Sequence, residues 1–215
     1  MVYLPSHFVE QSRESLIQTI REWPLATIIR MSPDGLTADH VPLVVVEEAD
    51  ALRLEGHVPL ANPIGDNEAD ETAVLVIFHG PEAYISPSWY PAKQEHGRVV
   101  PTWNYQVVQV RGALRVIRDA SWIRHQIDAL TTQQEAGMAS PWHVADAPAE
   151  YTARLVAQLK GIEIEVHALT GKTKASQNQP EANRRGVITG LGRLPEGRGA
   201  DMATLVRQTL NGDLG

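Results

Sequence analysis

The sequence predicts a mostly β protein, an antiparallel barrel with helices at its periphery. About six strand-like runs follow one another between residues 25 and 169, and turn signals separate the first of them. Helical periodicity is found only at the start and in the later part of the chain. The last run alternates cleanly, with Ile162 and Ile164 on one face and Glu163 and Glu165 on the other, so one face of that strand is expected to meet water.

The first half of the chain begins with a helix and a hairpin. Residues 13–23 place apolar side chains on one stripe, and Pro24 ends this predicted helix. Residues 25–31 form a short run that is rich in β-branched side chains. The turn signal Ser-Pro-Asp-Gly follows it, and an extended apolar run continues at 36–46. These features predict two hairpin strands.

Further strands are predicted at 51–58, 73–78 and 106–117. Asp119 has the side chain of a helix cap, and a second late helix is expected after Pro148. The predicted inner stripe of that helix consists of Tyr151, Leu155, Val156 and Leu159. The tail from Pro180 is expected to be helical, then loose at 192–199, then helical again.

Composition is ordinary for a soluble globular protein of 215 residues, with 43% hydrophobic and 21% charged residues. No run approaches the roughly 20 apolar residues of a membrane span. The first residues lack the basic and apolar regions of a signal peptide, and Cys is absent. We therefore expect a cytoplasmic protein.

The formal net charge of -7 argues against broad nucleic-acid binding, which needs clustered Lys and Arg. One basic cluster lies near the C-terminus, and it either binds a small anion or forms a solvated face. Its members are Lys172, Lys174, Arg184, Arg185, Arg193 and Arg198.

Residues 84–105 hold five of the ten Trp and Tyr residues and are interrupted by Pro87, Pro91 and Pro101. Such spacing of prolines disfavours regular helix and central strand. Rigid rings beside polar side chains suit the wall of a pocket for a planar ligand. Composition alone leaves an equal alternative, that the rings close the end of a barrel.

The sequence does not complete the common nucleotide-binding and metal-binding motifs. Gly171-Lys-Thr173 lacks the first glycine of a phosphate loop, because Val166 stands there, and no Rossmann fingerprint is present. The eight histidines include no close ligand pair, so no metal site is assigned. No residue is assigned as catalytic.

Seven segments together resemble the PaiB-like, FMN-binding negative transcriptional regulator family. They include Phe78-His-Gly-Pro-Glu-Ala-Tyr-Ile-Ser-Pro-Ser-Trp-Tyr90 and the ranges 2–8, 38–43, 56–63, 100–105, 161–165 and 171–178. The resemblance covers about residues 1–191, which are expected to form an FMN-binding split-barrel domain with peripheral helices. Residues 192–215 lie outside it, as a C-terminal loop and helix.

The resemblance implies an antiparallel split β-barrel related to pyridoxamine-phosphate oxidases. It also implies a homodimer with FMN at the subunit interface and a role as a negative transcriptional regulator. Two alternatives remain open, namely an FMN-dependent oxidoreductase of a small molecule and a haem-binding split-barrel protein. Direct DNA binding is opposed by the acidic charge balance.

By resemblance, Lys174, Ser176, Gln177 and Asn178 are cofactor-side residues. Lys172, Lys174 and Ser176 alternate along an extended segment, so they are expected to point to one side together. The FMN phosphate carries close to two negative charges, which suits the two lysines.

His40, His57 and Asn62 are the other predicted contacts of the phosphate or ribityl oxygens. As lone residues, the two histidines are better interpreted as structural, and it is the matched peptides that favour a contact with the cofactor. Trp103 and Tyr105 are expected to border the isoalloxazine, while Asn104 hydrogen-bonds its polar edge. Residues 86–91 are expected to form a rigid loop at the rim of the pocket.

Overall fold

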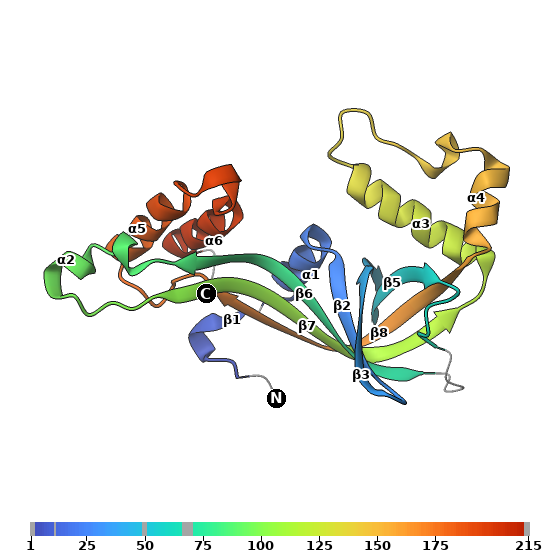
Figure 1. Cartoon of the computed structure of the whole chain (residues 1–215), viewed down its shortest axis with the longest axis horizontal. Coiled ribbons are helices and arrows are strands. Elements are labelled where there is room, and N and C mark those ends of the chain that lie inside the picture. Colours follow the sequence, from blue (N-terminus) through green and yellow to red (C-terminus); the bar gives the residue numbers. More distant parts are fainter. Residues whose placement is uncertain (1–2, 11, 49–50, 66–70, 213–215) are drawn as a thin grey trace. The chain divides into compact units, whose positions relative to one another are not determined.

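The computed structural model describes residues 3–10, 12–48, 51–65 and 71–212 (Figure 1). The chain folds into two compact units, described separately below. Unit 1 comprises residues 1–19, 79–108 and 170–215, and unit 2 comprises residues 20–78 and 109–169. Strands β6 (Thr72–Ile85), β7 (Thr102–Ile117) and β8 (Leu159–Lys174) contribute residues to both units.

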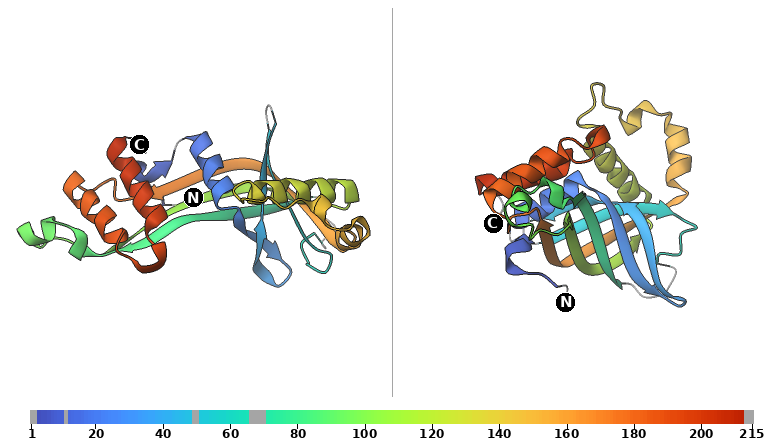
Figure 2. Two further views of the ribbon diagram at one scale, coloured as in Figure 1. Left: turned by 90° about the horizontal axis from the view of Figure 1, so that it is seen from above. Right: turned by 60° about the vertical axis from the view of Figure 1, so that its left-hand side comes forward.

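The described strands form one sheet in the order β3-β2-β6-β7-β8-β5-β4, and β1 (Val9–Glu10) pairs with β8. The other strands are β2 (Leu25–Ser32), β3 (Gly35–Pro42), β4 (Val44–Glu48) and β5 (Ala51–Pro59). In unit 2, β2 pairs antiparallel with β3 on one side and β6 on the other (Figure 2). The predicted mostly β, antiparallel fold with peripheral helices is confirmed.

The run predicted as one strand at 36–46 is broken at Leu43. Residues before this break pair with β2, whereas residues after it pair with β5. Leu43 is fully buried, and its N–H donates to the Pro24 carbonyl at 2.9 Å. The chain therefore changes its partner strand at this residue, which an apolar pattern alone does not reveal.

Two helices cover part of unit 2. Helix α3 (Ala120–Glu135) starts at the predicted cap, where Asp119 accepts a hydrogen bond from the Trp122 N–H at 2.7 Å. Helix α4 (Ala149–Val156) buries Thr152 and Val156. The predicted inner stripe was correct for Val156 but wrong for Tyr151 and Leu155, which are 48% and 44% exposed. The Thr152 hydroxyl accepts from Arg124 of α3, so the inner face is partly polar.

The final strand also departs from the prediction. Glu163 was expected to face water, yet its side chain is only 7% exposed, whereas that of Glu165 is 64% exposed. Arg53 on β5 and Arg115 on β7 both pair with Glu163 and cover it. Alternation thus placed the side chain on the correct face but did not predict the arginines above it.

Unit 1 contains the aromatic stretch and the C-terminal helices. The stretch begins within β6 and ends within β7, with a 3-10 turn at Pro87–Trp89 and the short helix α2 (Ala92–His96) between them. Pro91 occupies the N-cap of α2, where a missing N–H does no harm. A five-residue helix therefore fits between Pro91 and Pro101.

Helices α5 (Glu181–Leu191) and α6 (Ala200–Asn211) lie side by side in unit 1 (Figure 1). Their apolar side chains share a core with Ile85 and Tyr90 of the aromatic stretch; the helix members are Val187, Leu191, Met202, Ala203 and Val206. Residues on both sides of position 191 therefore contribute to one core.

Trp89 packs on the glycine face of α5. A Cβ on Gly190 would lie 2.2 Å from the indole Cδ2, and one on Gly186 would lie 2.0 Å from the Trp89 carbonyl oxygen. Only glycine permits this approach.

None of the described helices is long and apolar enough to cross a membrane. Helix α1 (Arg13–Glu22) confirms the predicted N-terminal helix.

Candidate functional site

A polar pocket of about 250 Å³ lies in unit 1. It is bordered by the start of β7, the end of β8 and the segment that leads from α2 into β7. Its lining residues are Tyr90, Arg98, Val99, Val100, Thr102, Asn104, Lys174, Ser176, Asn178 and Gln179. These include two cations and no carboxylate, so the pocket suits a ligand with acceptor atoms.

Asn104 is a buried polar group of this pocket. The residue is 0% exposed, and its Nδ2 donates to the Ser176 Oγ at 2.8 Å. Its Oδ1 is also buried and has no hydrogen-bond partner among the described residues. A buried acceptor without a donor is costly, which makes this atom a candidate ligand contact.

Ser176 stands in a sharp turn after β8. Its φ is 62°, the left-handed region, and no other described non-glycine residue has positive φ. Gln177 closes this turn, since its Oε1 accepts from the Ala175 N–H at 2.7 Å and its Nε2 donates to the Thr173 carbonyl at 2.6 Å. Gln177 therefore shapes the pocket without lining it.

The cations lie on two segments. The Lys174 ammonium donates to the Thr102 hydroxyl, and Arg98 lies in the segment before β7. Neither has an ion-pair partner within the described ranges. Burial raises the pKa of the Tyr90 phenol, so this ring stays protonated beside them.

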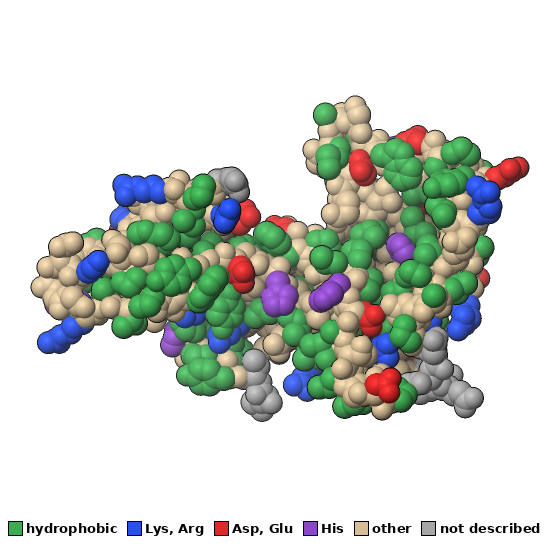
Figure 3. Space-filling view, in the orientation of Figure 1, with side chains coloured by type: hydrophobic (Ala, Val, Ile, Leu, Met, Phe, Trp, Pro, Cys, Tyr) green, Lys and Arg blue, Asp and Glu red, His purple; other side chains and the backbone are tan. Residues whose placement is uncertain are grey.

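Four of the eight residues predicted in this unit line the pocket: Asn104, Lys174, Ser176 and Asn178. Trp103 and Tyr105 do not line it. They alternate with Asn104 along β7, and Trp103 is 53% exposed. The Trp103 ring packs edge-on against Tyr84 with centroids 6.2 Å apart. On the face in Figure 3, hydrophobic side chains gather over β6 and β7 of unit 1.

Two further predicted residues, Lys172 and Gln177, do not line the pocket. The Lys172 ammonium lies 5.4 Å from the Tyr105 ring centroid and donates to the Tyr3 carbonyl. Lys172, Lys174 and Ser176 were expected to alternate along one extended segment, but β8 ends at Lys174. The left-handed turn then gives Ser176 its own direction.

The three residues predicted in unit 2 each have a partner. The His40 Nδ1 lies 3.2 Å from the Thr27 hydroxyl across the β2–β3 pair. Asn62 donates to Asp39 at 2.9 Å and accepts from the Ile64 N–H at 2.8 Å. His40 lies on β3 and His57 on β5, and these two strands are not neighbours in the sheet order.

His57 is held by a residue that sequence reasoning missed. Its Nδ1 lies 2.7 Å from Oε1 of Gln126, which is fully buried on α3 and donates to the Glu55 carbonyl. The sequence did contain a sign of this role, because Gln126 is a polar residue within the apolar stripe of its helix, three residues after Ile123. Whether His40, His57 and Asn62 contact a cofactor stays a prediction.

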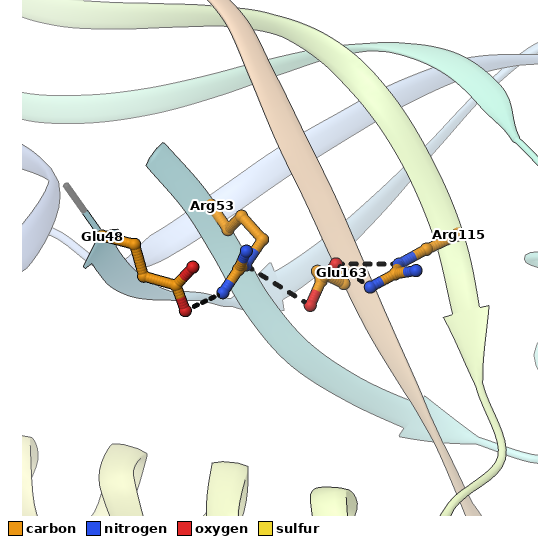
Figure 4. Close-up of polar contacts among 4 residues, drawn as sticks. All are labelled: Glu48, Arg53, Arg115 and Glu163. Carbon is orange, nitrogen blue, oxygen red and sulfur yellow. Dashed lines mark hydrogen bonds and ion pairs between the residues drawn. The ribbon is translucent and has the colours of Figure 1, made fainter. Parts of the chain in front are cut away.

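A row of charges crosses the sheet in unit 2 (Figure 4). It runs from Glu48 through Arg53 and Glu163 to Arg115, on β4, β5, β8 and β7 in turn. The Arg115 Nη2 lies 2.6 Å from the Glu163 Oε1, and the Arg53 Nε lies 3.6 Å from its Oε2. A second pocket of about 280 Å³ adjoins this row.

Comparison with known proteins gives the family. A family model described as "Putative FMN-binding domain" matches residues 2–168. The chain belongs to this FMN-binding domain family. The predicted PaiB-like resemblance is thereby confirmed. Asn104 lies within the matched region of this family, whereas Lys174, Ser176 and Asn178 lie beyond it.

Relatives span nearly the whole chain. An uncharacterized protein of Emericella nidulans is 32% identical over 96% of this chain and 97% of its own length. The protease synthase and sporulation protein PAI 2 of Bacillus subtilis is 28% identical over 97% of this chain and 98% of its own.

Among solved structures, the FAD and heme binding protein from Mycobacterium smegmatis has a TM-score of 0.56 at 18% identity. The match covers 77% of this chain and 73% of that one. At this identity the likeness concerns the fold alone. Together with the family match, it identifies the fold as the predicted antiparallel split β-barrel of the FMN-binding type.

Proposed function

We propose that this protein is an FMN-binding split-barrel homodimer that acts as a negative transcriptional regulator. Its family supports the cofactor, and the relative from Bacillus subtilis, named for protease synthesis and sporulation, supports a regulatory role. The homodimer follows from the family resemblance of the sequence. The net charge of -7 favours regulation through a protein or metabolite over broad contact with DNA.

The buried, unpartnered Oδ1 of Asn104 is the observation that carries the cofactor proposal. Buried polar atoms in folded proteins nearly always have a partner. This one lies in a pocket with Lys174 and Arg98, whose ammonium and guanidinium groups donate hydrogen bonds to an electron-rich ligand. A flavin offers both acceptor oxygens and an N–H donor, so the residues present fit it.

In the proposed complex, the residues of the pocket bind and orient the cofactor. Lys174 and Arg98 supply positive charge, and Asn104 and Asn178 supply directional hydrogen bonds. Gln177 keeps the turn that presents Ser176. Bound FMN would supply redox sensitivity, and the protein would supply its position and electrostatic surroundings.

The cofactor proposal is tested by titrating purified, flavin-free protein with FMN and following the quenching of flavin fluorescence. We expect binding with a Kd on the order of 1 µM or tighter. Replacing Asn104 with Leu, which removes both hydrogen-bonding atoms at similar volume, should weaken binding at least about tenfold. A wild-type protein that does not bind FMN contradicts the proposal.

The regulatory role needs a separate measurement. Gene expression with and without the protein should show increased transcription of its target genes when it is absent. Steady oxidation of a small substrate, with repeated bleaching and recovery of bound flavin, would instead indicate an FMN-dependent oxidoreductase. Stoichiometric haem uptake in place of flavin would contradict both.

A further inference from the structure

We propose that the pocket of unit 1 receives the pyrimidine edge of the flavin ring and not its phosphate. This inference rests on the proposed FMN binding and specifies which end of the cofactor the pocket takes. It starts from one short contact, the 2.8 Å hydrogen bond between Asn104 Nδ2 and Ser176 Oγ. Groups this close cannot contact opposite ends of one FMN molecule, because the ribityl chain separates ring from phosphate.

The hydrogen-bonding pattern selects the ring. The Asn104 Oδ1 accepts hydrogen bonds and cannot donate them. Phosphate oxygens near neutral pH are also acceptors and carry close to two negative charges. A phosphate beside this atom would leave it unpartnered and repel it, whereas the ring's imide N–H would donate to it.

The flanking residues complete the match. The imide N–H of a flavin lies between two carbonyl oxygens, which need donors. Lys174 and Arg98 are donors only, and Asn178 has an amide N–H₂. The pocket therefore contains both an acceptor and several donors, which are the groups that the acceptor–donor–acceptor order of the pyrimidine edge requires.

The pocket's size and support agree with this assignment. At about 250 Å³, it is smaller than the roughly 300–1,000 Å³ of pockets that enclose a whole drug-sized ligand. It thus holds one part of the cofactor. Residues next to the lining side chains are also held in place, since Gln106 Nε2 donates to the Thr173 hydroxyl and Gln177 holds the turn. Fixed neighbouring residues suit a rigid ring, whose hydrogen bonds require fixed directions.

The first test uses altered ligands on the wild-type protein. Binding of lumiflavin, which lacks both ribityl chain and phosphate, is compared with that of lumiflavin methylated at the imide nitrogen. We expect methylation to weaken binding at least about tenfold, since it removes the only donor for the Asn104 Oδ1. Equal affinities would overturn the inference. No protein variant is needed, so misfolding cannot confuse the result.

The second test separates ring from phosphate with Lys174→Met, measured with FMN and with riboflavin, which lacks the phosphate. We expect both affinities to fall by the same factor. Lys93→Met is the matched control, because Lys93 is an exposed lysine of the same unit, donates to the Ser88 hydroxyl, and does not line the pocket. It should leave both affinities unchanged.

The opposite assignment has a distinct signature. If the pocket held the phosphate, Lys174→Met would weaken FMN and spare riboflavin, and inorganic phosphate would compete with FMN. That result would overturn the inference while leaving FMN binding intact. A wild-type protein that binds neither FMN nor lumiflavin would instead contradict the proposed function itself.

Discussion

Glu55 on β5 and Glu163 on β8 lie directly opposite each other in the strand register, and both residues are buried. Like charges opposite each other in a sheet are destabilising. Arg53 and Arg115 compensate Glu163 through ion pairs at 3.6 Å and 2.6 Å. Burial, and next the charge of Glu163, raise the pKa of the Glu55 carboxyl. The two carboxyl groups therefore differ in their surroundings.

Stability should depend on pH through Glu55. A carboxyl whose pKa is raised on folding contributes stability below its unfolded pKa, about 4.3, and that contribution is lost as pH rises through the folded pKa. We expect Glu55→Gln to have a higher Tm than wild type at pH 7 and to lose this advantage near pH 4. Thermal unfolding across this range checks it. A Tm difference independent of pH would be the contrary result.

Glu163→Gln should destabilise the protein by about 1 kcal/mol, because it removes the buried carboxylate that Arg53 and Arg115 share, while Arg53 keeps Glu48 and Arg115 is reached by water. Glu165→Gln, two residues along the same strand and exposed, should change stability by less than about 0.5 kcal/mol. Denaturant unfolding gives both free energies. Equal effects of the two substitutions would show that the charge row of Figure 4 has no structural role.

Gly190→Ala should destabilise the protein although alanine favours helix. The gain in helix propensity is about 1 kcal/mol, but the added Cβ would lie 2.2 Å from the Trp89 ring, and such overpacking costs about 1–3 kcal/mol. Gly192→Ala is the control, since its nearest contact would be an ordinary 3.5 Å. Denaturation midpoints should fall for the first variant only. A stabilised Gly190→Ala variant would mean that Trp89 packs elsewhere in solution.

Ser176 has a left-handed backbone conformation, and its hydroxyl accepts a buried hydrogen bond from Asn104. Ser176→Ala should lower the free energy of unfolding by about 1–2 kcal/mol, because Asn104 Nδ2 loses its buried acceptor. Ser176→Gly loses the same bond but relieves the left-handed φ of 62°, which recovers about 1 kcal/mol. We expect the glycine variant to be the more stable of the two by urea unfolding. The reverse order would indicate that the turn is not strained.

Much of the fold followed from local pattern. The helix at residues 13–22, the cap at Asp119 and the positions of the main strands depend on periodicity, turn residues and capping, which act over a few positions. The break at Leu43 did not follow, because both halves remain extended and only the partner strand changes. Nor did the buried state of Glu163, which depends on arginines from two distant strands.

The candidate site was also predictable only in part. Matched peptides indicated Asn104, Lys174, Ser176 and Asn178, which share one pocket. They could not show that Gln177 folds back on the turn, because its partners are backbone atoms. Neither could they separate Trp103 from Asn104, since that division depends on strand alternation.

That alternation limits how this chain can vary in length. β7 places Asn104 toward the pocket and Trp103 toward the exposed side. Insertion or deletion of a single residue between Thr102 and Gln106 would exchange these two surfaces, replacing an amide by an indole at the pocket. Residues 92–100 lie outside β7, so an odd number of inserted or deleted residues there would not exchange the two faces of the strand. Homologues of different length should therefore differ there in any number of residues, and within the strand only in pairs.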